Sequence, residues 1–313
     1  MRSEFSRRLL GAMLRRRAQV EHGDALAHTS PMWPSWEHNL HRELHEQVRD
    51  LVGKGLRLHD YICALNSSQA FAMELLLPFR VGSTQGLEAF LSERLGRSVE
   101  VLEVELEFIG HGDALAETHG RLPEPDEPIT AADAALHLRD AEGRRGLLLV
   151  EVKLSEDGYT RCPGPESRAN RDRSACESQA FLDEPHRCYL KRPWRASRDR
   201  RYRAIFETEH GTLRAAFPGA PPQGRCSFYG DPQQLMRNHA LALAWCQEGR
   251  AEWWALALVH HDDNPDVLDG WIDYMTITND LGNFHRWPAS DLLHAVDHAL
   301  PGQAQRLRDT RLL

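Results

Sequence analysis

Three charged side chains, Asp133, Glu151 and Lys153, stand where neighbouring strands would bring them together. Glu151 and Lys153 end an apolar run that starts at Gly146, and Asp133 precedes Glu151 by 18 positions. Because side chains alternate along a strand, Glu151 and Lys153 point to the same face. Two carboxylates and the Val152 carbonyl suit Mg²⁺ or Mn²⁺, and a nearby ammonium can position or deprotonate a water. The residues predict metal-assisted hydrolysis at phosphorus.

Strands joined by turns must hold this group in place. Asp140-Ala141-Glu142-Gly143 has the composition of a turn that leads into the strand ending at Lys153. Upstream, residues 99–109 alternate apolar and acidic side chains, which indicates a strand with one wet face. The expected core elements are a helix at 84–95, strands at 99–109, about 129–139 and 146–153, a helix that starts at 231, and a strand at 253–260.

Helical patterns dominate the first 80 residues, which we expect to form a region separate from residues 81–313. Residues 1–19 indicate a basic amphipathic helix and 36–52 a second helix. Asn66 or Ser67 could cap a further helix that Pro78 stops. The remaining expectations are an irregular insertion at about 155–230, a short strand at 274–278 and a helix at 289–300.

The order of these features resembles the PD-(D/E)XK nuclease superfamily, in which a strand with an Asp precedes a strand ending in Glu-x-Lys. Residues 66–70, Asn-Ser-Ser-Gln-Ala, also resemble a segment of bacterial restriction endonuclease-like proteins. The likeness spans about residues 84 to 261, and Ala132 stands where the family's proline would be. It implies an α/β fold, with a restriction-endonuclease-like mixed sheet core flanked by helices, and a metal-dependent nuclease.

The resemblance implies two further site residues. Such nucleases often place an acidic residue on the first core helix and a glutamine on a helix downstream, the places that Glu88 and Gln234 occupy here. Gln234 and Asn238 share one helix face because they are four residues apart. Gln233 is the adjacent alternative. A solvated side chain is the simpler interpretation of Glu88.

A basic stretch with aromatic side chains lies inside the insertion. Arginines can hold phosphates through paired hydrogen bonds, and rings can stack on unpaired bases, so this stretch could bind nucleic acid. A solvated loop would have the same composition. Between 187 and 203 the basic residues are Arg187, Lys191, Arg192, Arg195, Arg198, Arg200, Arg201 and Arg203, with Tyr189, Trp194, Tyr202 and one acid, Asp199.

Four cysteines of the insertion form a second candidate metal site. Four thiolates could bind a structural zinc ion or hold an iron–sulfur cluster. They contain no C-x₂-C pair, so ordinary reduced cysteines are the alternative. An arginine-rich insertion with few large apolar residues needs such a staple to fold. The four are Cys162, Cys176, Cys188 and Cys226.

Composition is compatible with a cytoplasmic enzyme. The 313 residues are 41% hydrophobic, which is enough for a sizeable core, and carry a net charge of −8. No apolar run is long enough to cross a membrane, so we expect no membrane partner. Six cysteines without a secretory signal favour a reducing compartment.

We therefore expect a Mg²⁺- or Mn²⁺-dependent nuclease that acts on nucleic acid, DNA in the first instance, as an endonuclease of restriction or defence. The alternative is a non-catalytic module that binds nucleic acid through the Arg/Cys-rich insertion. The target sequence, the choice of DNA or RNA, and the oligomeric state, with a homodimer as one candidate, stay open at this stage.

Overall fold

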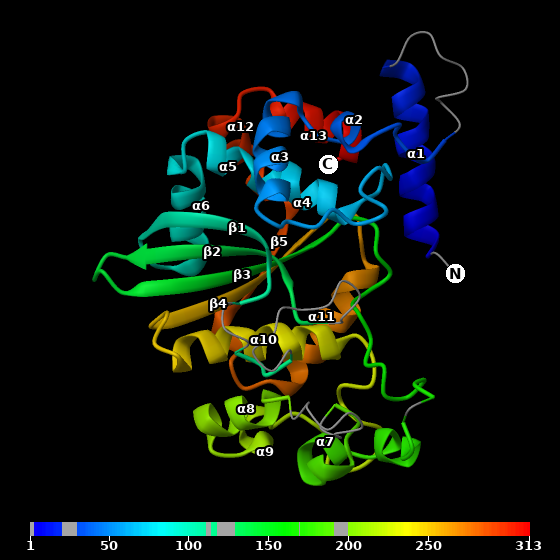
Figure 1. Cartoon of the computed structure of the whole chain (residues 1–313), viewed down its shortest axis with the longest axis vertical. Helices are drawn as coiled ribbons and strands as arrows, with labels where there is room; N and C mark the ends of the chain where they lie inside the picture. Colours follow the sequence, from blue (N-terminus) through cyan, green and yellow to red (C-terminus); the bar gives the residue numbers. More distant parts are fainter. Residues whose placement is uncertain (1–2, 21–29, 111–113, 118–128, 169, 191–199) are drawn as a thin grey trace.

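A computed structural model gives the structure of residues 3–20, 30–110, 114–117, 129–168, 170–190 and 200–313. A five-stranded mixed sheet crosses its centre, with the strands in chain order (Figure 1). The first three strands pair antiparallel and the last three parallel. The strands are β1 (Val99–Phe108), β2 (Ala132–Asp140), β3 (Arg145–Lys153), β4 (Trp253–His260) and β5 (Phe284–Pro288).

Burial explains the order of the strands. Every residue of β3 after Arg145 is buried, and so is β4 after its first residue. A strand with apolar side chains on both faces must be covered on both faces, so it lies at the centre of the sheet between two layers of helices. By contrast, β1 has exposed positions between its buried ones, as its acidic alternation predicts. The core order and the mixed α/β class are confirmed.

The helices above the sheet come from both ends of the chain (Figure 1). Phe5 and Leu307 belong to the same apolar core as the upper face of the sheet. Glu74, which is fully buried, binds Arg306 and Arg311 at 2.8 Å each and so ties the two ends together. These helices are α1 (Glu4–Val20), α2 (Trp36–Asn39), α3 (His45–Gly53), α4 (Ser68–Leu76), α5 (Pro78–Val81), α6 (Gln85–Leu95), α12 (Leu293–Ala299) and α13 (Gln303–Arg311), with 3-10 turns at Arg42–Leu44 and Ala289–Leu292.

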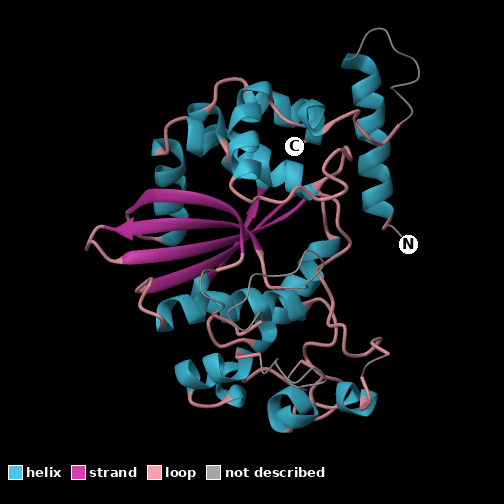
Figure 2. Cartoon of the chain, in the orientation of Figure 1, coloured by secondary structure: helices cyan, strands magenta, loops and turns pink. Residues whose placement is uncertain are grey.

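Two helices cover the lower face of the sheet, and the insertion lies beneath them as short helices and loops (Figure 2). The covering helices are α10 (Pro232–Gln247) and α11 (Asp266–Ile277). Pro232 starts α10 at the position where a proline costs no backbone hydrogen bond. The insertion contains α7 (Ala180–Asp183), α8 (Tyr202–His210) and α9 (Leu213–Ala216), and further 3-10 turns lie at Arg173–Glu177, Pro185–Arg187 and Leu281–Asn283.

Local signals placed several helix ends correctly. The Ser67 hydroxyl accepts a hydrogen bond from the Ala70 amide at 3.2 Å and caps α4. Gly96 ends α6 with a φ of 65°, a left-handed conformation that glycine adopts without strain. The division of the chain near residue 80 stays a prediction.

Two expectations about secondary structure were wrong. The helix expected at 36–52 is interrupted, because Leu40 adopts an extended backbone after α2. Residues 274–278 form the end of α11 and the residue after it, and the strand of the tail is β5. The apolar residues of this segment that are buried, Val267, Trp271 and Tyr274, recur every three or four positions, which is the period of a helix.

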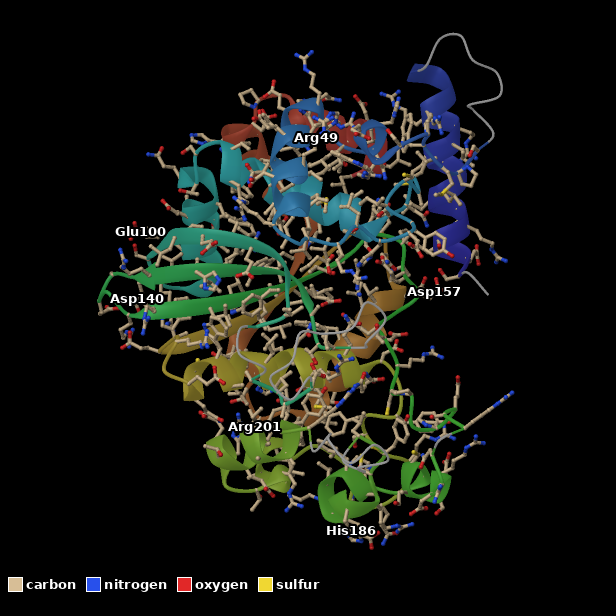
Figure 3. All side chains as sticks on the ribbon, in the orientation of Figure 1. Arg49, Glu100, Asp140, Asp157, His186 and Arg201 are labelled. Carbon is tan, nitrogen blue, oxygen red and sulfur yellow. The ribbon has the colours of Figure 1, made fainter. Side chains whose placement is uncertain are left out.

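The hairpin between β2 and β3 fixes the register of the candidate site. Asp140, at the tip of the hairpin (Figure 3), accepts hydrogen bonds from the amides of Glu142 at 3.1 Å and Arg144 at 2.9 Å. The resulting register places Ala134 opposite Val150. Asp133 therefore lies beside the end of β3.

Candidate active site

The structure brings Asp133, Glu151 and Lys153 together where β2 begins and β3 ends. The Asp133 Oδ2 atom accepts a hydrogen bond from the Val152 amide at 2.6 Å. The Lys153 ammonium lies 2.7 Å from Glu151 Oε1, as expected for alternate residues on one face of a strand. The sequence analysis therefore placed these three side chains in one group correctly.

Two amides on α10 fix the orientation of Glu151. Gln234 Nε2 donates to Glu151 Oε1, and Asn238 Nδ2 donates to Oε2 at 2.9 Å. Both amides reach the same carboxylate because they stand one helical turn apart. The Gln234 carbonyl in turn accepts from the Thr160 amide at 2.7 Å. Gln233 is buried away from this group, and neither of its amide atoms has a hydrogen-bond partner.

Burial and charge set the protonation of the group. The exposed fraction is 1% for Glu151 and 8% for Lys153. Burial opposes the charge on Lys153, but Glu151, Asp133 and Glu156 outweigh it and raise the pKa of the ammonium above its usual value. These acids favour the protonated form of Lys153, which can orient a water molecule and neutralise negative charge.

Asp133 has one oxygen that is open to a ligand. Burial and the nearby Glu151 raise the pKa of Asp133 well above its usual value. The Val152 amide donates to its Oδ2 atom. Its Oδ1 atom accepts no hydrogen bond from the residues that the structure describes. Two carboxylates this close repel each other unless a cation lies between them, so the pair suits a bound metal ion.

A further acid, which the sequence analysis did not select, faces Asp133. The register of β1 and β2 places Glu107 directly opposite Asp133, and the Glu107 charge also raises the pKa of Asp133. Glu107 adopts a φ of 51°, which is unfavourable for a residue with a side chain. Gln69 on α4 donates to Glu107 Oε1 at 2.8 Å and so holds the carboxylate.

Glu88 lies elsewhere, so its expected place in the site is corrected. Its carboxylate accepts hydrogen bonds from the Thr84 hydroxyl at 2.9 Å and from the Val101 amide at 3.1 Å. Val101 pairs with Leu138, which is five residues along β2 from Asp133. A strand advances about 3.3 Å per residue, so Glu88 acts at the far end of the sheet as a bridge between α6 and β1.

The oxygens at this place fit a hard cation. Asp133 and Glu151 supply carboxylates, Glu107 lies nearby, and the buried Asn238 Oδ1 accepts no hydrogen bond from the residues that the structure describes. Carboxylate and amide oxygens are the donors that Mg²⁺ and Mn²⁺ prefer. The Val152 carbonyl stays a predicted ligand.

A second buried group was not predicted. His210 Nε2 and His239 Nε2 lie 2.9 and 3.1 Å from the same Asp280 oxygen. The other ring nitrogen of His239 lies 2.8 Å from the Tyr274 hydroxyl, which fixes the orientation of the ring. Two nitrogens and one oxygen can hold a divalent ion. The sequence signals this group only through His239, a histidine within the apolar pattern of α10.

The basic stretch is less available than its composition indicated. Arg187 pairs with Asp172 at 3.1 Å and also with Glu184, and Arg203 pairs with Glu207 at 2.7 Å. All three acids lie outside residues 187–203: Asp172 and Glu184 precede the stretch, and Glu207 lies one helical turn after Arg203. Arg201 is exposed at the start of α8 (Figure 3).

Its aromatic residues divide in the same way. Tyr202 is 1% exposed and donates its hydroxyl to Glu117, so it cannot stack on a base. Tyr189 lies beside a pocket that the insertion's cysteines line. Residues 191–199, which include Lys191, Arg192, Trp194, Arg195, Arg198 and Asp199, lie outside the described residues.

Comparison with known proteins identifies the family. A family model described as restriction endonuclease associating with ARP matches residues 7–301. The chain belongs to this family. No curated protein matches the chain, and no solved structure does. Its five-stranded mixed sheet flanked by helices is consistent with the restriction-endonuclease-like fold that the sequence predicted, and membership of this family supports that fold.

Family membership links the chain to the nuclease role of restriction endonucleases. The family model starts in α1 and ends in the loop after α12, so it includes the helical layer from both ends as well as the sheet and the insertion. Among the described residues, no helix combines the length and the apolar character that a membrane span needs.

Proposed function

We propose that this protein is a metal-dependent endonuclease that hydrolyses phosphodiester bonds in DNA. The observation that carries the proposal is the convergence of Asp133, Glu151 and a protonated Lys153 at one end of the sheet. The arrangement is similar to the PD-(D/E)XK pattern noted in the sequence. Membership of a restriction endonuclease family supports it independently.

Two carboxylates would hold the metal ion: Asp133 through its Oδ1 atom and Glu151 at the end of β3. Glu107, whose charge reaches Asp133, would face the ion through a water molecule, because the three carboxylates of the described structure do not all lie within 4.8 Å of one another. Gln234 and Asn238 keep Glu151 in one rotamer through hydrogen bonds to both of its oxygens. Fixed ligands of this kind lower the cost of ordering the site when a cation binds.

A bound Mg²⁺ ion supplies a polarised phosphate oxygen and an activated water. Lys153 then acts as a fixed cation. Its ammonium is protonated and nearly buried, so it can donate hydrogen bonds to the attacking water and to the phosphate oxygen that gains charge in the transition state. Buried cations stabilise such charge more strongly than exposed ones because water screens them less.

DNA, with the defence role of restriction enzymes, is the substrate that the family supports, and the family description adds association with ARP as a partner. We propose both for this chain, with a homodimer as the oligomeric state to test first. The alternative of a purely nucleic-acid-binding module loses support, because Arg187, Arg203 and Tyr202 of the basic stretch are engaged within the protein.

Substrate panels test the proposal. Supercoiled plasmid, linear DNA with blocked ends and single-stranded RNA should each be incubated with the protein and Mg²⁺. We expect nicked and linear products from the plasmid, which has no ends, and little product from RNA. Binding of the plasmid without any cleavage under Mg²⁺ or Mn²⁺ would support the binding module instead.

A further inference from the structure

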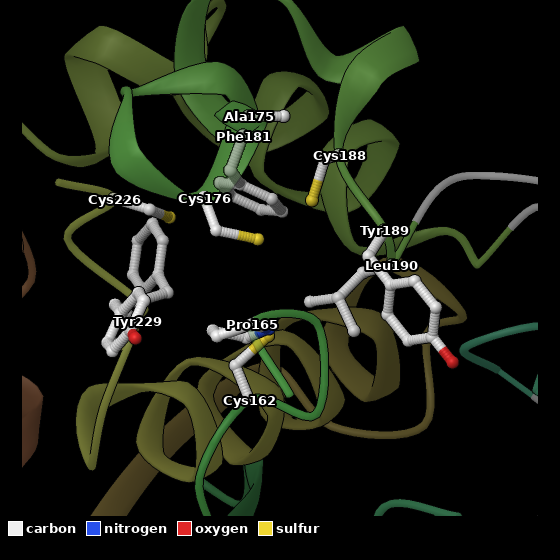
Figure 4. Close-up of a pocket in the computed structure, with 11 residues that line it drawn as sticks. Cys162, Pro165, Ala175, Cys176, Phe181, Cys188, Tyr189, Leu190, Cys226 and Tyr229 are labelled. Atoms are coloured by element: carbon white, nitrogen blue, oxygen red, sulfur yellow. The ribbon is translucent and has the colours of Figure 1, made fainter. Parts of the chain in front are cut away.

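Four cysteines from separate parts of the insertion meet at one pocket. Figure 4 shows the sulfur atoms of Cys162, Cys176 and Cys188 facing a common space, with Cys226 at its edge. The chain positions of the four cysteines differ by 12 to 64 residues, so the fold and not the local sequence brings them together. None of the four forms a disulfide within the described part of the chain. We propose that this pocket binds an iron–sulfur cluster through these cysteines.

The pocket is built from segments that are tied to one another. The Cys226 amide donates to the Cys176 carbonyl at 3.1 Å. An added Cβ atom at Gly164 would stand 3.4 Å from the sulfur atoms of both Cys162 and Cys176, an ordinary contact distance, and 3.1 Å from the Tyr189 Cβ atom. Residue 164 therefore lies beside both sulfurs, with its tightest contact to Tyr189.

The surroundings suit a cluster of low polarity. Phe181, Phe228 and Leu190 line the pocket, so the cysteines face mainly apolar side chains. The Asn170 amide donates to Cys176 Sγ at 3.6 Å, and hydrogen bonds to cysteine sulfur are one means by which proteins tune such clusters.

The spacing of the sulfurs separates a cluster from a single zinc ion. Zinc with Zn–S bonds of about 2.3 Å holds its four sulfurs about 3.8 Å apart at the corners of a tetrahedron. Among the described residues, the only group of three or more ligand atoms that all lie within 4.8 Å of one another is His210, His239 and Asp280. No three of the four sulfurs are therefore that close. A cluster attaches each cysteine to a different iron atom, so its sulfurs are farther apart.

The cluster would act as a staple next to the candidate active site. Cys162 follows Thr160, whose amide holds Gln234, and Cys226 precedes the start of α10 by six residues. Linking these two segments fixes the end of α10 that carries Gln234. The insertion already has apolar packing of its own, including Phe181 against Phe228, and the cluster would add to it by closing the loops that carry the cysteines.

Chemical analysis of protein purified without oxygen tests the proposal. We expect about four iron and four acid-labile sulfide per chain, the content of a [4Fe–4S] cluster, together with broad visible absorption that bleaches on reduction. Cys162→Ser and Cys188→Ser should each lose most of the iron and sulfide. Cys63→Ser and Cys246→Ser are the matched controls, and they should keep the full content because these cysteines lie outside the pocket.

Three results would overturn the proposal. The first is about one equivalent of zinc without sulfide. The second is metal-free protein whose thiols react freely and that takes up no iron or sulfide on anaerobic reconstitution. The third is full iron content in the Cys162→Ser and Cys188→Ser variants. Circular dichroism checks that the variants fold. Iron and sulfide content does not depend on DNA cleavage, so failure here is distinct from failure of the proposed nuclease function.

Discussion

Glu107 faces Asp133 directly across the β1–β2 ladder, and it does so with a backbone conformation that is unfavourable for a glutamate. Like charges opposite each other destabilise a sheet, and a left-handed residue adds a cost of about 1 to 3 kcal/mol. Gln69 and His59 hold the Glu107 carboxylate in this position. A cation bound at Asp133 would offset the repulsion between the two acids.

Glu107→Gln should therefore lower Mg²⁺-dependent cleavage by at least about tenfold and weaken Mn²⁺ binding, because a negative charge beside the metal site is lost. The same change should leave the melting temperature equal or higher, because it removes like-charge repulsion. Glu88→Gln is the matched control. It should cleave at the wild-type rate, because Glu88 bonds to Thr84 and Val101 away from the site. Equal loss in both variants would count against a role of Glu107 at the metal site.

Lys153→Ala should reduce cleavage by at least about a hundredfold, as expected when a group that positions and charge-stabilises is removed. DNA affinity, measured by fluorescence anisotropy, should change little, because Lys153 is nearly buried. The control is Lys54→Ala, an exposed lysine on the opposite layer that pairs with Asp50. Undiminished nicking by the Lys153→Ala protein would remove Lys153 from the mechanism. The folding of the variant should be checked by thermal melting, because the buried Glu151 carboxylate loses the Lys153 ammonium that pairs with it.

The two adjacent glutamines of α10 should behave in opposite ways. Gln234→Ala removes one of the hydrogen bonds that orient Glu151 and should slow cleavage by about tenfold or more. Gln233→Leu should leave cleavage unchanged and raise stability by about 1 to 3 kcal/mol, because it removes two buried polar atoms that lack partners. Cleavage rates and urea melts of both proteins decide this, and the reverse pattern would show that the wrong glutamine was chosen.

Acid should destabilise the protein below neutral pH. Burial lowers the pKa of His239, His260 and His261 in the folded state. Below about pH 6.5 the unfolded chain takes up protons at these residues that the folded chain does not, so stability falls as the pH falls. We expect the melting temperature to drop by about 5 °C or more between pH 7.5 and 5.5. His186→Gln, at an exposed position, should keep the same slope. A flat profile would contradict the prediction.

The sequence was sufficient for the part of the site that local pattern determines. Glu151 and Lys153 follow from alternation along one strand, and Gln234 follows from its place at the start of a helix marked by Pro232. Each of these signals lies within about ten residues. The same is true of the Ser67 cap and of Gly96.

What the sequence could not predict depends on contacts between distant residues. Glu107 is one of several acids in an alternating strand, and only the register with β2 distinguishes it from Glu103 or Glu105. Likewise, Arg187 is neutralised by Asp172, which lies outside the basic stretch. The last residues of α11, near Tyr274, have the composition of a strand, and the helical spacing of buried residues is visible only over the whole of Asp266–Ile277.

Cleavage of supercoiled plasmid by the wild-type protein and by Asp133→Asn, across a range of Mg²⁺ concentrations, tests the central claim most directly. Asparagine keeps the size of Asp133 and can still accept a hydrogen bond from the Val152 amide, but it removes the charge that would bind the cation. We predict Mg²⁺-dependent nicking by the wild-type protein, abolished by a chelator, and none above background by the variant. Cleavage at the wild-type rate by Asp133→Asn, or cleavage that persists in the chelator, would contradict the assignment.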